Sequence, residues 1–507
     1  MFLGVSTAQL CAQYFNNLYD FDSTQSDWGL AVFQENSGSY SIFGVTYRQT
    51  VQKRLPFIMN VQQDGNMLFK KSIISSDTFS YEIGNGPVKK LGGNQGYISP
   101  LMQILPQSPV SNVNAGICRV NHLGDTIFTK FYTDTALYKE YFWDCDTAAN
   151  GGYILGGYNV YKGYPFTSNY NLIIRTDSTG TLKWHKKFNY NSNYWSSIAS
   201  LEWLPNNTIF AASIIGQIKT VSYNIPTKTY SHNRPWLMIL DSNGNILKQR
   251  IFPPSFAGLG TAFKDKHGGY MIWGQLDTFF APTPSDFRNL PTFMAHLDED
   301  FQIDWMHSFL DTQSHKHLWG IKQLRDSNYL VYGIDQNMLY STDRGWVSKF
   351  NLQGNMLWER TFFIDSTMPK YITNAFQETN GDLLFVGHHR DKNLPQWRGF
   401  DVWFFRTDST GCPSIGCPFP TSIPPDPSPE TKLSLYPNPT NGELNIRCDQ
   451  GGMFVVYNLQ GISVFQKEIK QGITKLELPN NFPSGMYIGR MLGNKSNNSS
   501  IRFVYEP

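Results

Sequence analysis

A hairpin signature that recurs along the chain is the strongest constraint on its fold. Residues 171–189, NLIIRTDSTGTLKWHKKFN, read as two short strands around a tight turn. Asp177 starts the turn and Gly180 supplies a positive φ near its end. Related stretches follow at a step of roughly 54 to 64 residues, a period typical of propellers and solenoids. The turns of these copies are centred on Gly65, Gly124, Gly180, Gly244, Asp300, Gly354 and Gly411.

A second series of turns lies between the hairpins at a similar step. Each copy joins a turn to a strand that ends at a small residue, as in GGYILG at 151–156 and GGYMIWG at 268–274. Other copies lie at 37–44, 94–97, 205–208, 328–333 and 380–387. Each repeat therefore holds two hairpins, or four strands, and seven such repeats predict a seven-bladed β-propeller. Unrelated hairpins in sandwich domains are the alternative, but the shared step of the two series favours the propeller.

The two ends of the repeat array predict how the ring closes. The seventh copy stops at 408–411 and a Pro-rich segment follows, so its outer strand is missing. Residues 13–19, QYFNNLY, resemble an outer strand without its hairpin. We therefore expect this N-terminal strand to pair beside 403–407, which would leave the ring without an open edge.

The composition is that of an all-β chain and excludes several functional classes. Aromatic residues make up 15% and charged residues 16%, and the net charge is +2. This balance gives no electrostatic basis for binding nucleic acid. No apolar run approaches the roughly 20 residues that span a bilayer, so no transmembrane segment is predicted. Residues 1–12 are interpreted as a short or truncated signal peptide, although they lack a basic start; an ordinary chain terminus is the alternative.

No motif in the repeats has the spacing of a catalytic or metal-binding constellation, so the sequence predicts no catalytic residue, metal or cofactor. The tight turns repeat around the ring, as structural parts do. The connections between second and third strands instead differ from blade to blade and are aromatic, which suits stacking on sugars or contact with protein. Packing of these loops on one another is the alternative. The candidate binding residues are Tyr161, Tyr164, Tyr230, Trp236, Phe280, His388, Arg390 and Trp397.

The composition changes after the seventh repeat. Residues 13–411 are assigned to the propeller, and residues 412–431 are Pro-rich and read as a semi-rigid linker. The only closely spaced cysteines, Cys412 and Cys417, lie at the start of this segment. In an oxidising compartment we expect them to form a local disulfide.

The last 76 residues, 432–507, carry a strand pattern of their own. Alternating stretches such as LSLYPNPTNGELNIR at 433–447 and MFVVYNLQGISVF at 453–465 predict a small β-sandwich. The order of its motifs resembles the type A C-terminal sorting domain of the type IX, or Por, secretion system. The matching residues are Tyr436, Pro437, Asn438, Pro439, Gly442, Gly461, Gly485 and Tyr487. The resemblance implies Sec export, type IX secretion to the outer-membrane surface or beyond, and the secretion machinery as partner.

The resulting interpretation is a secreted or surface β-propeller that acts as a binding or scaffolding module for glycan or protein. Two alternatives remain open: a secreted glycan-active hydrolase or lyase built on the propeller, and an adhesion or surface-assembly protein. Converging carboxylates in a pocket at the propeller axis would favour the enzyme. An aromatic face would favour binding.

Overall fold

The computed structural model shows an all-β chain that divides into two compact units, Met1–Ser422 and Ile423–Pro507. Besides strands, the described residues contain two short 3-10 turns, Gly92–Asn94 and Ala149–Gly151, and no α-helix. The structure describes residues 15–21, 26–48, 53–74, 79–83, 88–105, 113–132, 137–161, 169–190, 194–221, 228–253, 256, 258–276, 291–309, 314–337, 342–362, 370–390, 399–413, 433–436, 440–448, 451–458, 463–479, 482–483, 485–492 and 500–505.

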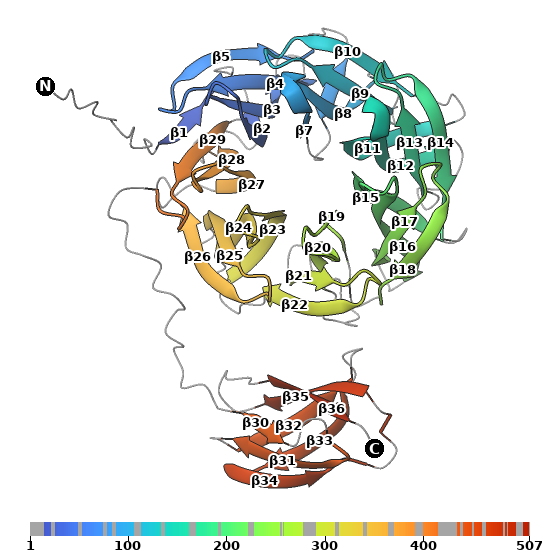
Figure 1. Cartoon of the computed structure of the whole chain (residues 1–507), viewed down its shortest axis with the longest axis vertical. Helices are drawn as coiled ribbons and strands as arrows, with labels where there is room; N and C mark the ends of the chain where they lie inside the picture. The colour runs from blue at the N-terminus through green and yellow to red at the C-terminus, as the bar shows by residue number, and fades with distance from the viewer. Residues whose placement is uncertain are drawn as a thin grey trace, which may run out of the picture. The chain divides into compact units, whose positions relative to one another are not determined.

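The first unit is a ring of seven blades, each running from an inner to an outer strand (Figure 1). Blade 1 consists of β2 (Ser26–Gln34), β3 (Tyr40–Arg48), β4 (Lys53–Val61) and β5 (Met67–Ser72). In blade 2 the inner strand comes in two pieces, β6 (Ser80–Ile83) and β7 (Lys89–Lys90), before β8 (Tyr97–Ile104), β9 (Val113–Val120) and β10 (Thr126–Phe131). Blade 3 consists of β11 (Leu137–Thr147), β12 (Tyr153–Tyr161), β13 (Asn169–Thr176) and β14 (Leu182–Phe188).

The remaining blades repeat this arrangement. Blade 4 consists of β15 (Trp195–Trp203), β16 (Ile209–Val221), β17 (Lys228–Leu240) and β18 (Ile246–Ile251). Blade 5 consists of β19 (Ala262–Lys264), β20 (Tyr270–Gln275), β21 (Thr292–Leu297) and β22 (Ile303–Phe309). Blade 6 consists of β23 (Ser314–Gln323), β24 (Tyr329–Asn337), β25 (Thr342–Phe350) and β26 (Met356–Phe362). Blade 7 takes β27 (Lys370–Gln377), β28 (Leu383–Arg390) and β29 (Phe400–Thr407) from the end of the repeat array.

The fourth strand of blade 7 comes from the other end of the propeller. Strand β1 (Asn16–Tyr19) pairs antiparallel with β29, with Asn16 opposite Phe405 and Tyr19 opposite Val402. This is the neighbour that the unfinished seventh repeat predicts. The pairing satisfies the outer edge of β29 and joins the two ends of the ring.

A hydrophobic core fills each of the seven interfaces between neighbouring blades. The inner faces of the strands supply it, because alternate apolar side chains of one blade meet those of the next. Blades 7 and 1, which close the ring, share a core that includes Phe15, Tyr40, Phe57 and Phe404. Similar clusters join every other consecutive pair of blades. The closed ring therefore has no uncovered blade face within its described part.

The tight turns that follow the third strand are built alike in blades 2 to 7. A side-chain Oδ1 accepts backbone N–H groups two and four residues later, as Asp177 does from Thr179 and Thr181, both at 2.9 Å. The same bonds form at Asn121, Asp241, Asp298, Asn351 and Asp408. These local bonds replace ladder bonds at the turn. The turn series is therefore structural in all six blades.

The tyrosine of the second sequence motif links one blade to the one before it. Tyr40, at the start of β3, donates its hydroxyl to Glu378 of blade 7 at 2.9 Å. Tyr329, at the start of β24, donates in the same way to Asp265 of blade 5. Tyr97 makes the equivalent bond to Glu35. The recurrent Tyr thus fixes the register between neighbouring blades as well as filling the core.

The second unit is a small β-sandwich with its own core. One sheet consists of β30 (Ser434–Tyr436), β31 (Glu443–Cys448) and β34 (Gly472–Glu477). The other consists of β33 (Ser463–Ile469), β32 (Gly452–Tyr457), β35 (Gly485–Leu492) and β36 (Ser500–Tyr505). Side chains of both sheets, including Leu444, Phe454, Leu476 and Phe503, form one buried cluster between them.

Candidate functional site

Two hollows open among the inner strands at the end of the ring opposite the tight turns. The smaller, of about 220 Å³, is bounded by blades 1, 2, 6 and 7. Its lining residues are Trp28, Leu30, Val45, Arg54, Glu82, Ile83, Trp319 and His388. The larger, of about 510 Å³, lies among blades 4, 5 and 6 and includes Trp273, His317, Gln336 and again Trp319. Trp319 is 40% exposed and borders both hollows. We call the smaller one the axial aromatic site.

A β-bulge presents Trp319 at this position. The register of β23 against β24 shifts between Leu318 and Gly320, so Trp319 is the extra residue. Inner strand β2 has the same shift between Gly29 and Ala31, which leaves Leu30 as its extra residue. A bulge turns a side chain out of the regular alternation of a strand. The repeated shift therefore brings side chains of different blades to one side of the site.

An aromatic wall from blades 1, 6 and 7 forms one side of the axial aromatic site. The ring of His388 stacks on Tyr371 at 4.7 Å between centroids and meets Phe400 edge-on at 5.2 Å. Trp28 lies 5.7 Å from Phe400, and Trp319 lies 6.5 Å from His388. These residues are far apart in sequence, so the wall exists only in the closed ring. Flat faces of this kind suit a ligand with an apolar, planar side.

An ion pair provides the charged edge of the same site. Nη1 of Arg54 lies 2.7 Å from Oε1 of Glu82, and the Arg54 guanidinium lies 5.8 Å from the Trp28 ring. The Arg54 side chain is about half exposed and that of Glu82 less so. An exposed pair of this kind contributes little stability. Its donors and acceptors nevertheless lie beside the aromatic wall, where they can orient a polar ligand.

His388 carries a polar atom that the protein does not satisfy. Burial lowers the pKa of His388 to about 3, because an imidazolium among aromatic rings would lose its hydration. The side chain is only 7% exposed, and within the described residues its Nδ1 has no hydrogen-bond partner. A neutral imidazole offers one donor and one acceptor. The ring therefore retains hydrogen-bonding capacity beside the hollow.

The structure describes the side chains of only some of the predicted binding residues. His388 and Arg390 lie in β28, and the Arg390 guanidinium lies 5.9 Å from the Phe400 ring, which puts both at the aromatic wall. Tyr161 ends β12 and Tyr230 lies within β17, but their side chains are outside the described part of the structure. Tyr164, Phe280 and Trp397 lie outside the described residues altogether.

Trp236 is not an exposed loop side chain, and that part of the prediction is wrong. It lies in the regular part of β17, 2% exposed, in the core between blades 3 and 4. Its Nε1–H donates to Oε1 of Gln249 at 2.9 Å. The strand continues further than the turn signals indicate, so the alternation of the sheet turns Trp236 inward.

Carboxylates do converge near the axis at the tight-turn end, but they are used by the fold. Asp144 accepts the backbone N–H of Leu201 at 2.8 Å, Asp146 that of Trp203 at 2.9 Å, and Glu202 that of Lys264 at 2.8 Å. Each bond ties an inner strand to the next one. Burial raises the pKa of Asp144 to about 7, with the Lys89 ammonium acting in the opposite direction. These acids therefore serve to hydrogen-bond each inner strand to that of the next blade.

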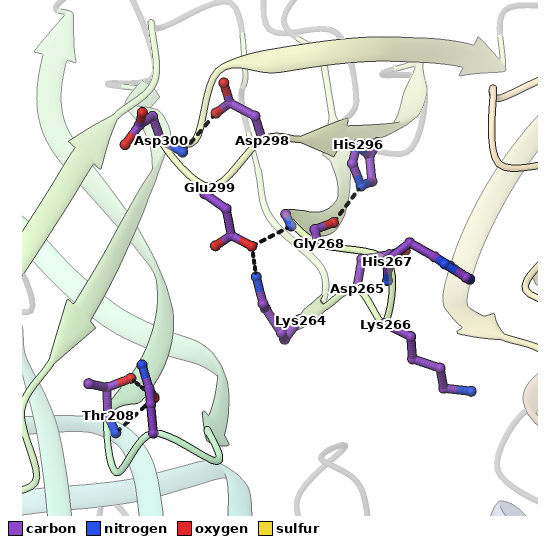
Figure 2. Close-up of polar contacts among 12 residues, drawn as sticks. Thr208, Lys264, Asp265, Lys266, His267, Gly268, His296, Asp298, Glu299 and Asp300 are labelled. Atoms are coloured by element: carbon purple, nitrogen blue, oxygen red, sulfur yellow. Dashed lines mark hydrogen bonds and ion pairs between the residues drawn. The ribbon is translucent and has the colours of Figure 1, made fainter.

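Figure 2 shows the corresponding contacts in the turns of blade 5. Oε1 of Glu299 accepts the N–H of Gly269 at 2.9 Å and also contacts the Lys264 ammonium. His296 lies 3.1 Å from the carbonyl oxygen of Gly268. Gly268, Gly269 and Glu299 belong to two neighbouring turns, and Lys264 and His296 lie near the ends of the adjoining strands. They fasten the two hairpins of the blade together.

A third group of acids could hold a metal ion. Asp20, Asp27 and Asp401 each offer a carboxylate oxygen within 4.8 Å of the others. Oδ2 of Asp27, which is fully buried, accepts the N–H of Phe21 at 2.6 Å. Carboxylate oxygens are ligands that Ca²⁺ accepts. This group could not be predicted from the sequence, because its members come from the two ends of the propeller.

The C-terminal motif residues divide into exposed and structural ones. Tyr436 is 45% exposed, whereas Tyr487 is buried and donates its hydroxyl to the carbonyl oxygen of Pro483 at 2.6 Å. Gly442 has a φ of 119°, a conformation that favours glycine. Gly485 also has a positive φ, 154°. Pro437, Asn438, Pro439 and Gly461 lie outside the described residues.

The predicted disulfide lies only partly within the described residues. Cys412 is buried, and its sulfur lies 3.3 Å from Nη2 of Arg360 in blade 6. Cys417 belongs to residues 414–432, outside the described part. The pairing therefore stays a prediction. The rest of the predicted linker, residues 414–431, and the N-terminal segment 1–12 also lie outside the described residues.

These observations define the class of protein first: a closed seven-bladed β-propeller joined to a small β-sandwich. The family comparison then identifies the second unit. Residues 434–506 match the secretion system C-terminal sorting domain. The chain is therefore a cargo of the type IX secretion system, carried to the cell surface or the extracellular space. Among the residues described above, none forms a helix with the length and apolarity that crossing a bilayer requires.

Comparisons with curated proteins and with solved structures give no information about the function of the propeller. No curated protein matches the chain. An α-L-arabinanase of Penicillium chrysogenum complexed with arabinobiose is 12% identical, with a TM-score of 0.39 over 67% of this chain and 98% of that chain. The β-propeller domain of the Trilobed protease from Pyrococcus furiosus is 7% identical, with a TM-score of 0.39 over 80% of this chain and 98% of that chain. Scores this low carry no information about activity.

Proposed function

We propose that the propeller is a secreted saccharide-binding module and that the axial aromatic site is its binding site. The observation that carries the proposal is the unsatisfied, buried Nδ1 of His388 beside two tryptophans, Trp28 and Trp319. A sugar offers an apolar ring face for the indoles and hydroxyl groups for the imidazole. The Arg54–Glu82 pair supplies further donors and acceptors at the edge.

The size of the site favours one residue of a saccharide over a large ligand. Its volume of about 220 Å³ lies below the roughly 300 to 1,000 Å³ of pockets that enclose drug-sized molecules. The adjoining hollow of about 510 Å³ shares Trp319 and can take a neighbouring residue of the same chain. A saccharide lying across Trp319 would therefore use both hollows.

Binding accounts for the lining residues better than hydrolysis does. Most glycosidases need two carboxyl groups, one as acid and one as base or nucleophile. Among the described lining residues of the two hollows, Glu82 is the sole carboxylate, and it is paired with Arg54. The axial acids Asp144 and Asp146 are held by the backbone of the next blade. A glycan-binding function is the one these contacts support.

A glycan array probed with the secreted full-length chain tests the proposal, followed by calorimetric titration of each hit. Trp319→Ala should weaken binding at least about tenfold, the equivalent of about 1.4 kcal/mol. His388→Phe keeps the ring but removes both nitrogens, and should weaken binding of the same sugar. Tyr190→Ala is the matched control, because Tyr190 is an exposed aromatic outside both hollows. Equal affinity in all three variants would contradict the proposal, as would release of reducing sugar by the wild-type chain.

A further inference from the structure

A third hollow lies on the opposite face, at the tight-turn end of blades 5, 6 and 7. Its volume is about 420 Å³. Its floor is apolar, with Leu324, Leu330, Ala375 and Phe376, and Gln323 and Gln377 add two amides. Three cations, Lys266, Lys322 and Arg325, complete the lining, which contains no carboxylate. We call it the basic hollow. It is separate from the axial aromatic site and shares no lining residue with it.

The carboxylates nearest in sequence to these cations form hydrogen bonds or ion pairs with other residues. Asp265 accepts the hydroxyl of Tyr329 and an amide N–H of Gln323. Asp326 pairs with Lys349, with 2.7 Å between Oδ2 and Nζ. Lys266, Lys322 and Arg325 have no ion pair within the described residues. Within the described part of the chain, the three cations of the basic hollow therefore have no carboxylate partner.

Glu378, at the end of β27, is also used elsewhere. It forms an ion pair with Arg406 at 2.6 Å, and Oε1 accepts the hydroxyl of Tyr40 at 2.9 Å. These contacts direct its carboxylate to the seam between blades 7 and 1. Asp265, Asp326 and Glu378 thus each bond to groups other than the three cations.

Lys322 shows what this arrangement costs the protein. Its side chain is half-buried, and its Nζ donates to Oδ1 of Asn374 in blade 7 at 3.2 Å. Burial, with a smaller contribution from the nearby Lys89, lowers the pKa of Lys322 to about 8. Burial also acts to lower the pKa of Lys89, but the carboxylates of Asp144 and Asp146 outweigh it and raise that pKa above the ordinary lysine value. Of these two lysines, only Lys322 has no carboxylate partner among the described residues, and a partly buried charge without one is unfavourable.

The two glutamines hold the rim of the basic hollow in place. Oε1 of Gln323 accepts the backbone N–H of Lys266 at 3.0 Å, and Oε1 of Gln377 accepts that of Arg325 at 2.7 Å. Both bonds run between blades. They fix the backbone of each cation, so the rim is positioned before any ligand arrives. Figure 2 shows the Lys266 side chain directed away from Lys264 and Glu299.

We propose that the basic hollow binds a small organic molecule bearing an oxyanion group: a carboxylate, sulfate or phosphate. The anion lies between Lys322 and the two rim cations, which supply charge-assisted hydrogen bonds. The rest of the ligand covers the apolar floor around Leu324 and Phe376. The hollow is larger than an inorganic anion needs, so the proposal is an organic ligand carrying the charged group.

Titration of the full-length chain at fixed ionic strength tests this proposal. The probes are glucuronate, glucose 6-sulfate and glucose 6-phosphate, with sodium sulfate and sodium phosphate as free anions and glucose as the uncharged control. At least one organic anion should bind saturably, with a dissociation constant below about 1 mM. It should bind more tightly than either free anion. Glucose should not compete. No saturable binding of any organic anion, or tighter binding of free sulfate or phosphate, would overturn the proposal.

Variants then locate the bound anion. Lys322→Met removes the enclosed charge while keeping much of the side-chain volume, and should weaken binding about tenfold or more. The rim variant Lys266→Ala/Arg325→Ala should do the same, and both residues are exposed, so folding is not at risk. Lys183→Met is the matched control, because Lys183 is an exposed lysine outside the hollow. Equal affinity in the Lys322, rim and Lys183 variants would overturn the assignment. Trp319→Ala should leave anion binding unchanged, which keeps this test independent of the saccharide site.

Discussion

Trp403 and Asn16 lie 387 positions apart in the chain, yet Nε1–H of Trp403 donates to Oδ1 of Asn16 at 2.7 Å. The bond crosses the seam where the N-terminal strand completes blade 7. Trp403 is fully buried, and Leu18, the residue of β1 opposite it, is 40% exposed. The hydrogen bond therefore links a buried indole of β29 to β1, the outermost strand of blade 7.

We expect the seam bond to contribute measurably to stability. Asn16→Ala should lower the free energy of unfolding by roughly 1 kcal/mol, because a buried indole N–H loses its partner. Combined with Trp403→Phe, it should give a coupling energy of about 0.5 to 1.5 kcal/mol in a double-mutant cycle followed by urea denaturation. Leu18→Ala, in the same strand, is the control. A coupling energy of zero would show that β1 does not close the ring through this contact.

The turn glycine of blade 3 should be required for stability and irrelevant to binding. Gly180 has a φ of 77°, and a Cβ there would lie 2.8 Å from Cε2 of Phe128 in blade 2. Gly180→Ala should therefore cost about 1 kcal/mol or more from the backbone alone, with the contact adding to it. Gly92→Ala is the control, because a Cβ at Gly92 meets nothing within 4 Å. Thermal unfolding measures both. Equal melting temperatures would contradict the structural role of the turn.

Trp236 should behave as a core residue. Its ring lies edge-on to Phe188 at 5.9 Å, in the interface between blades 3 and 4. Trp236→Ala should cost roughly 3 to 5 kcal/mol of unfolding free energy, because it leaves a cavity. Trp236→Phe should cost less. The folded Phe variant should bind any saccharide ligand with the same affinity as the wild type. A loss of affinity without a loss of stability would instead show that Trp236 takes part in binding.

Burial of His388 predicts a dependence of stability on acid pH. Its folded-state pKa of about 3 lies below the ordinary value near 6.5. Above pH 6.5 the group is neutral in both states and contributes no slope. As the pH falls from about 6.5 toward 3, the unfolded chain binds a proton that the folded protein excludes, so stability declines. His388→Phe should flatten this decline in melting temperature between about pH 7 and 4.

The parts of the fold that depend on neighbours in sequence could be predicted. The turn around Asp177 and Gly180 is specified by its own residues, and its repetition gives the blade count. The closing strand could be predicted because a missing strand at one end matches a surplus strand at the other. The alternation of apolar residues also indicates the sandwich of the second unit.

The candidate site could not be predicted in the same way. Trp319 reaches the axis because a bulge shifts the register of β23, and a bulge depends on how two strands pair. Arg54 and Glu82 meet only because blades 1 and 2 are adjacent. That Lys322 has no ion pair among the described residues is invisible in the sequence, because it depends on the groups to which the nearby acids bond. His388 and Arg390 were expected in a connecting loop and instead lie at the end of β28. Trp236 was misplaced in the same way, because β17 begins earlier than the turn signals indicate.

Removal of residues 432–507 should separate export from folding. The two units have separate hydrophobic cores: Leu444, Phe454 and Phe503 belong to the C-terminal core, and the seven blade interfaces are complete without them. The truncated propeller should therefore keep its melting temperature within a few degrees and retain saccharide binding if the full chain has it. Because residues 434–506 match the sorting domain, the truncated chain should accumulate within the cell envelope.

Fractionation of cells expressing the two forms measures this outcome. A point variant sharpens the test: Tyr436→Ala changes an exposed motif residue, whereas Tyr487→Ala removes a buried ring and its hydroxyl bond to Pro483. We expect Tyr436→Ala to reduce export with the C-terminal unit still folded, because an exposed aromatic is available to a receptor. Tyr487→Ala should reduce export by unfolding the unit. Normal release of the truncated chain into the medium would mean that the propeller itself carries the export signal.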